Sequence, residues 1–321
     1  MKKSTIKAII ILLTLYLTGC SSQVNIIDTD EKHYDIQYFT DRTDQFYEYA
    51  SPTNVAFVVT TDQGRYHFSD SEMSLEKVYE YMEAFEAGVG YANDWFGQDD
   101  IMLDLYFIQR DFTAEYGSNE FTINGSGVDG VVWVEYDYSF EPLPFHASHI
   151  LMHESIHALC DVHAEKTNFP RRPEPYPFFW SMLLEEGLAT MLEHSYGLSV
   201  GKLHDVYIYH YTQDGSDSSE GALDKVNEIA EALDHLALYS IYSNGEEFYA
   251  ELPYDILQSY NTSASFLYWL LVHNGSKEDF RRVYVDINLM EEVYGKDMNV
   301  MIENWLEYLG QPSIIYTNKE S

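Results

Sequence analysis

The chain has 321 residues, of which 45% are hydrophobic and 16% aromatic, a composition typical of a globular protein with a substantial core. Its formal net charge at pH 7 is -35, from 53 acidic and 18 basic side chains. Such a surface repels phosphates and anionic headgroups, so the composition argues against nucleic acid as a partner and against charge-driven membrane binding.

The first 19 residues have the pattern of a secretory signal peptide. Three lysines precede an apolar run at 8–18, which is too short to span a bilayer. The segment Leu17-Thr18-Gly19-Cys20 resembles the lipobox of bacterial lipoproteins. That resemblance implies that Cys20 carries a lipid and that the mature protein is extracytoplasmic, attached to the membrane by this N-terminal lipid alone. Cys160 is then the one cysteine left in the body, which rules out an intramolecular disulfide.

Residues 20–50 are rich in acidic side chains, and we interpret them as an acidic tether between the lipid and a folded body. The body divides by pattern into an N-terminal α/β subdomain at 51–145 and a helical metal-site subdomain at 146–315. Together, residues 51–315 are expected to form one catalytic domain. Strands followed by helices predict the α+β class.

The N-terminal part of this body alternates apolar and polar residues. Residues 54–61 and 66–68 are predicted to form a hairpin around the turn Asp62-Gln63-Gly64. Ser74 has the character of a helix N-cap, and helical spacing of apolar residues continues from there to Trp95. Two further strands are expected at 101–108 and 131–136.

The segment His149-Ile150-Leu151-Met152-His153-Glu154-Ser155-Ile156-His157 contains the pattern H-E-x-x-H in a largely apolar stretch that favours a helix. Residues four apart lie on one helix face, so His153 and His157 can share one metal ion. Glu154 lies beside them, where its carboxylate can act as general base towards water. Buried histidine and glutamate are costly unless they coordinate or pair, which favours a zinc centre.

The rest of the chain is predicted to be helical. Four prolines within 166–177 indicate a loop, and a helix is expected at 178–196. An acidic turn at 212–221 has spacing that does not match an EF-hand calcium loop. The remaining predicted helices lie at 222–236, 262–273, 276–283 and 297–309.

A catalytic zinc usually has three protein ligands, and three residues compete for the third place. His163 lies at the distance from His157 that metzincins use, but Cys160 stands where metzincins have the glycine that ends the helix. Glu185 and Glu186 lie together on the following helix, and helical periodicity does not separate them.

The segment Glu186-Gly187-Leu188-Ala189 is similar to the E-G-x-A motif of gluzincins, the thermolysin-like and aminopeptidase-N-like zinc peptidases. This resemblance implies a zincin fold with a small mixed sheet, and Glu186 as the third zinc ligand. It also implies a strand at 130–136 that binds substrate, and Tyr260, before a small-residue helix, as the oxyanion donor. For Tyr260, simple packing at the start of that helix is the alternative.

The resemblance implies hydrolysis of a peptide or protein substrate. Aminopeptidases of this group carry a G-x-M-E-N element, which the region around Gly130-Val131-Val132 lacks, so an endopeptidase is expected. Two alternatives stay open: a metzincin-like peptidase that uses His163, and a lipoprotein with a binding role and a non-catalytic metal site. Zinc could also activate water against another amide or an ester.

Overall fold

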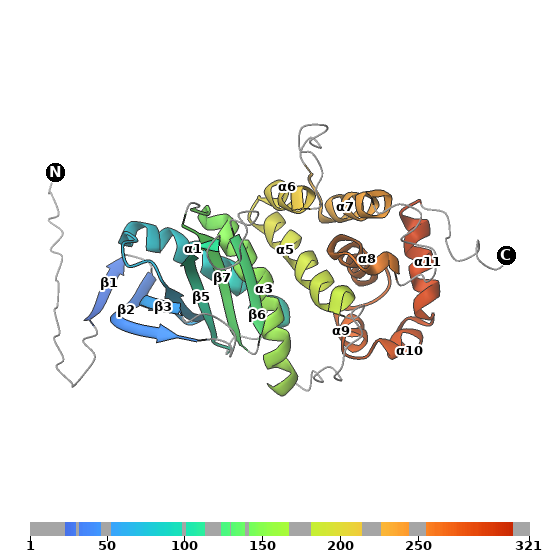
Figure 1. The fold of residues 1–321 in the computed structure, drawn as a ribbon. Coiled ribbons are helices and arrows are strands. Elements are labelled where there is room, and N and C mark those ends of the chain that lie inside the picture. The colour runs from blue at the N-terminus through green and yellow to red at the C-terminus, as the bar shows by residue number, and fades with distance from the viewer. Residues whose placement is uncertain are drawn as a thin grey trace, which may run out of the picture.

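The computed structural model describes residues 23–29, 32–45, 53–97, 101–112, 123–128, 130–138, 141–166, 181–213, 226–243 and 255–310. Figure 1 shows a β-sheet at one side of the molecule, a group of helices at the other, and helix α3 between the two. The segment predicted as a signal peptide, Cys20, the predicted proline-rich loop from residue 167 on and the predicted acidic turn from residue 214 on lie outside the described residues.

The sheet has seven strands in the order β1-β2-β3-β4-β5-β7-β6. β4 and β5 pair in parallel, as do β5 and β7, and the other neighbours pair antiparallel. This mixed sheet, followed by helices, confirms the α+β class. The strands are β1 (Gln23–Thr29), β2 (Lys32–Asp44), β3 (Thr53–Thr60), β4 (Gly64–Phe68), β5 (Leu103–Arg110), β6 (Ile123–Val128) and β7 (Val131–Asp137).

Residues 23–29 and 32–44 were expected to belong to a tether, but they form the strands β1 and β2 of the sheet. Tyr34 and Ile36 point into the main core and are almost completely buried. Charged residues in this segment, such as Asp35 between these two, hid the alternation, since a strand with one buried face needs only every second residue to be apolar. The N-terminal body therefore begins before residue 51.

Strand β6 was not predicted, and it forms the edge of the sheet next to helix α3. Its sequence Ile-Asn-Gly-Ser-Gly-Val has few of the β-branched residues that mark a strand. β7 pairs with β5 on one side and with β6 on the other. The expectation that residues 130–136 offer a free strand to a substrate is therefore wrong, because β6 holds the edge position.

The described helices are α1 (Leu75–Phe96), α3 (Pro144–Lys166), α5 (Gly187–Ser199), α6 (Leu203–Gln213), α7 (Ile229–Ser243), α8 (Tyr260–His273), α9 (Lys277–Val285), α10 (Met290–Tyr294) and α11 (Met298–Tyr308). The predicted hairpin is confirmed by β3 and β4, and the predicted long helix by α1. The side chain of Ser74 caps α1 by accepting the Lys77 amide at 3.3 Å. Within the described ranges, no helix combines the length and apolar content that a membrane span requires.

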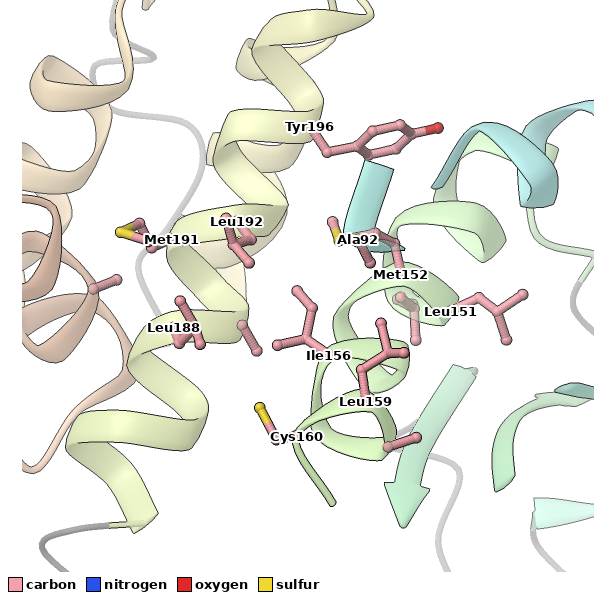
Figure 2. Close-up of a cluster of buried hydrophobic side chains, with 14 of the residues drawn as sticks. Ala92, Leu151, Met152, Ile156, Leu159, Cys160, Leu188, Met191, Leu192 and Tyr196 are labelled. Carbon is pink, nitrogen blue, oxygen red and sulfur yellow. The ribbon is translucent and has the colours of Figure 1, made fainter. Parts of the chain in front are cut away.

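The core joins the sheet to the helical half through α3. Figure 2 shows Ile156 of α3 facing Leu188 and Leu192 of α5, with Leu159 of α3 farther from α5. These side chains are almost fully buried and belong to one hydrophobic cluster. α3 is therefore packed on both sides, so its polar residues lie between two rigid layers.

Candidate metal centre

Three side chains that could bind a metal come together between α3 and the turn before α5. His153 and His157 project from α3, and Glu186 is the last residue of a π-helical turn, Ser181–Glu186. One ligand atom from each residue lies within 4.8 Å of the other two. π-Helical turns are rare and occur often at functional sites, because the extra residue turns a side chain out of the regular helical position.

The distances among these atoms fit a zinc ion. Glu186 Oε2 lies 3.4 Å from His153 Nε2 and 3.3 Å from His157 Nε2. Tetrahedral zinc with bonds of about 2.0–2.1 Å places neighbouring ligand atoms about 3.3 Å apart. Two imidazoles and one carboxylate are also a ligand set used by catalytic zinc sites. Both distances to Glu186 therefore have the length expected between ligands of one zinc ion, and the three residues could hold a metal ion.

The charged groups of this cluster shift one another's pKa values. Burial alone raises the pKa of Glu186, but its contacts with His153 and His157 outweigh burial and bring the pKa well below the ordinary range. Burial alone lowers the pKa of His153, while hydrogen bonds to Glu186 and Glu193 raise it well above 6.5. The carboxylate thus attracts positive charge at this point, either a proton on an imidazole or a metal ion.

Glu154 lies on the side of α3 that faces the edge strand β6. Its side chain contacts Gly125, where an added Cβ would come within 2.9 Å of Glu154 Cγ. Gly127 approaches the Glu154 backbone so closely that a Cβ would clash with its carbonyl oxygen. Burial raises the pKa of Glu154 above 4.5, although both neighbouring histidines oppose this. A carboxylate whose pKa is raised by burial holds a proton more readily than a free one, which suits a general base that must later return that proton.

Glu193 contacts the Nδ1 atom of His153, whereas the Nε2 atom of the same ring faces Glu186. Glu193 was not among the site residues predicted from the sequence. Its Oε2 lies 2.9 Å from His153 Nδ1 and 3.0 Å from His210 Nε2. With Nδ1 bonded in this way, the Nε2 atom of His153 is left to face Glu186. Such a carboxylate fixes the tautomer and orientation of a metal-binding imidazole.

A spacing argument could have found this carboxylate. Glu193 lies seven residues after Glu186, and His149 lies four before His153, so each pair shares a helix face. His149 Nε2 is 3.3 Å from Glu193 Oε1, and burial lowers the pKa of His149 to about 4. The signal was therefore present as helical periodicity, but it becomes meaningful only when two helices are known to face each other.

Two tyrosines border the site. Tyr260, at the first position of α8, is 44% exposed, and burial together with Glu186 and Glu154 raises its pKa to about 12. Tyr209 on α6 has a raised pKa from burial and then from Glu193, Glu154 and Tyr260. These shifts mean that the Tyr260 phenol lies within electrostatic range of both site glutamates, and it is protonated at neutral pH. It can therefore donate a hydrogen bond there.

The competing ligand candidates are placed elsewhere. α3 continues without interruption from Pro144 to Lys166, so it has no left-handed turn at Cys160 that would bring His163 back to the centre. Six residues beyond His157, His163 lies about 9 Å farther along the helix axis. Within the described part of the chain, the metal-like cluster includes Glu186 and does not include Glu185.

Gly187 permits a close helix contact, as its position in the motif suggests. A Cβ there would lie 2.7 Å from Ser263 Cβ and 3.1 Å from the Ser263 carbonyl carbon. Ser263 belongs to α8, so Gly187 allows α5 to approach α8. Gly187 therefore serves the contact between α5 and α8, and the nearest neighbours of its Cβ position do not include α3.

Comparisons with known proteins place this chain in no family. No family model matches its sequence, and no curated protein matches it significantly. The function of this protein is therefore inferred from the geometry and chemistry of the site.

Proposed function

We propose that this protein is a zinc-dependent peptidase of the zincin type, with a thermolysin-like arrangement of helix, glutamate and edge strand. The observation that carries the proposal is the placement of Glu186 Oε2 at 3.3–3.4 Å from the Nε2 atoms of both H-E-x-x-H histidines. His153, His157 and Glu186 would hold the metal. When bound, zinc supplies a Lewis acid that lowers the pKa of water from about 15.7 to about 7 and polarises a carbonyl group.

The protein's own residues then have separate roles. Glu154, buried beside the ligands, accepts a proton from water on its carboxylate and returns it to the leaving amine. Because burial raises the pKa of Glu154, its carboxylate accepts the proton more readily than a free carboxylate does. Tyr260 carries its proton at neutral pH and donates a hydrogen bond to the oxyanion. Glu193 is a positioning residue that keeps the His153 ring in place.

The proposed substrate is a peptide or protein in extended form. β6 ends the sheet beside α3, and its outer edge can pair with an extended chain as an added strand. Gly125 and Gly127 bring this edge close to Glu154, so a paired peptide would pass the general base. Main-chain pairing does not require a free terminus, which favours cleavage within a chain. The N-terminal pattern ending at Cys20 would place this activity outside the cytoplasm on a lipid anchor.

The first test is the zinc content of the full chain and its variants. We expect one zinc per wild-type chain and loss of that zinc in Glu186→Gln. Glu185→Gln is the matched control, because it removes the same charge at the neighbouring residue, and it should keep its zinc. His163→Gln should keep it as well. Loss of zinc in the His163 variant would move the site to a metzincin-like ligand set.

The second test separates catalysis from metal binding. Glu154→Gln should retain zinc and lower the hydrolysis of a blocked fluorogenic peptide library by about 10²–10⁴-fold, because the general base is removed. A wild-type chain that binds zinc but cleaves no peptide, amide or ester would contradict the enzyme proposal and favour a binding lipoprotein.

A further inference from the structure

A cavity lies at the carboxyl ends of three parallel strands, and its lining contains none of the three candidate metal ligands. It has a volume of about 290 Å³. Asp70 follows β4, Gln109 lies near the end of β5 and Tyr136 near the end of β7, and all three line the cavity. Met73, just before α1, and Tyr81, in α1, also line it. Crevices at the carboxyl ends of parallel strands are common binding sites in α/β sheets.

Tyrosines from three places in the chain contribute to the lining of this cavity. Tyr81, Tyr136 and Tyr138 line it. The Tyr136 ring stacks on Phe107 with centroids 4.5 Å apart, and Phe107 in turn packs against Tyr81 at 4.8 Å. The Tyr81 hydroxyl donates to the Pro142 carbonyl oxygen. Tyr138 is 64% exposed and lies at the mouth. Two rings are therefore fixed by the core, and one is open to a ligand.

The charges around the cavity are negative. Its lining contains two carboxylates, Asp70 and Glu141, and no basic side chain. Glu141 forms an ion pair with Lys77, whereas Asp70 accepts the Glu72 amide at 2.8 Å and has no ion pair within the described ranges. Burial, followed by Asp70, raises the pKa of Tyr136. The Asp70 carboxylate therefore acts on a buried phenol without a cation to balance it.

These features select one class of ligand. An anion would be repelled by Asp70 and Glu141. Calcium takes six to eight oxygen ligands at short distances, more than two carboxylates and one amide provide. A cationic ammonium group, in contrast, is attracted both by tyrosine ring faces and by a carboxylate. The volume, at the lower end for ligand pockets, suits a small head group.

We propose that this cavity binds an organic ammonium group, held by the open ring face of Tyr138 and by the carboxylate of Asp70. The group could belong to a free quaternary amine or to the basic side chain of a peptide, since the recognition chemistry is the same. This inference is independent of the zinc centre.

The test is isothermal titration of the full chain with choline, with N-acetyl-lysine methylamide and with 3,3-dimethylbutan-1-ol, a neutral analogue shaped like choline. We expect at least one cation to bind about tenfold or more tightly than the neutral analogue, in buffer near physiological salt to screen the overall charge. Tighter binding of choline would indicate a free quaternary amine, and tighter binding of the lysine derivative a peptide side chain.

Variants locate the binding in the cavity. Asp70→Asn and Tyr138→Leu should each weaken it by about tenfold, while Tyr138→Phe should keep it, because the ring face is retained. Asp35→Asn, at an exposed site on β2, removes the same charge elsewhere and should bind like the wild type. Tyr138 is largely exposed, so its variants should fold normally. Equal binding of the neutral alcohol, binding unaffected by Asp70→Asn and Tyr138→Leu, or no binding of either cation at millimolar concentration would overturn the proposal.

Discussion

Glu193 illustrates at the residue scale how a side chain that would not touch the metal can control it. It contacts His153 Nδ1 at 2.9 Å and His210 Nε2 at 3.0 Å from a position that is almost fully buried. The charge of this carboxylate strengthens its hydrogen bond to His153 and increases the basicity of the ring. An amide at this position would keep the shape but lose the charge.

We therefore expect Glu193→Gln to weaken zinc affinity by about 10–100-fold, the usual cost of losing such a partner. Competition with a fluorescent chelator measures this affinity. Glu193→Asp, which restores the charge, should recover part of the loss. If Glu193→Gln binds zinc as tightly as the wild type, Glu193 is merely a structural residue. Circular dichroism of the same samples shows whether the fold is intact.

At the level of helices, two glycines in α1 allow the effect of helix packing on stability to be measured apart from the effect of helix propensity. A Cβ on Gly88 would lie 2.9 Å from the Ser148 carbonyl oxygen and 3.1 Å from Met152 Cβ, both on α3. A Cβ on Gly90 would meet the side-chain amide of Gln63, at 2.9 Å. The backbone of α3 cannot move away from an added Cβ as easily as the end of the flexible Gln63 side chain can.

Gly88→Ala should therefore destabilise the protein by about 1–3 kcal/mol, the usual cost of overpacking. Gly90→Ala, in the same helix, should be neutral or more stable by up to about 1 kcal/mol, because alanine favours the helix. Urea unfolding of both variants gives the difference. Equal effects of the two substitutions would show that α1 and α3 are not in this close contact.

The end of β2 is joined to β5 through His67, a residue of β4 that contacts both neighbouring strands. His67 Nδ1 is 3.3 Å from the Arg42 guanidinium, and its Nε2 is 2.8 Å from Asp104 Oδ1. Because arginine can only donate, Nδ1 accepts and Nε2 carries the hydrogen that Asp104 receives. Its ring also stacks on Tyr106 with centroids 4.0 Å apart. His67 is thus held as a neutral imidazole.

Burial is the largest cause that lowers the pKa of His67 below 6.5; Arg42 lowers it further, while Asp104 and Asp44 oppose this. The folded protein then binds this proton more weakly than the unfolded chain. The contribution to stability is present above pH 6.5 and is lost as the pH falls through the folded pKa.

We expect the free energy of unfolding of the wild type to fall more steeply between pH 6.5 and 4.5 than that of His67→Gln, which can keep both hydrogen bonds. The difference in slope should be at most about 1.4 kcal/mol per pH unit. The pKa of Asp104 is lowered from 3.8, so its own titration falls below this window. Parallel slopes would contradict the neutral state of His67.

At the scale of the whole molecule, the proposed zinc would connect the two halves of the protein. α3 packs on the sheet side against α1, β6 and β7, whereas Glu186 enters from the helical half. A metal held by His153, His157 and Glu186 would join them in the folded state, and the unfolded chain would not maintain this arrangement.

Zinc should therefore raise the melting temperature of the metal-free protein, and EDTA should reverse the change. A free zinc concentration of 100 times the Kd would add about 2.7 kcal/mol to the free energy of unfolding. Glu186→Gln, scanned by calorimetry at the same zinc concentration, should show little of this shift. A full shift in that variant would mean that zinc binds elsewhere.

Much of the fold was predictable where the cause is local. The hairpin of β3 and β4 and the helices α1, α8, α9 and α11 follow from apolar periodicity and from their capping or turn residues. β6 and the first two strands were not, because their stability comes from pairing with distant strands. A strand such as Ile123–Val128 gains its partners only after β7 and α3 are in place.

That His153 and His157 share a helix face, with Glu154 beside them, could be predicted from the sequence, because helical geometry relates residues four apart whatever surrounds them. The sequence left Glu185, Glu186 and His163 as candidates, because their distance from this helix depends on how the chain returns. The tertiary structure shows that Glu186 faces both histidines and that Glu193 forms a hydrogen bond with His153. The physical reason is that contacts between two helices are set by packing and by a π-turn, which short-range periodicity does not encode.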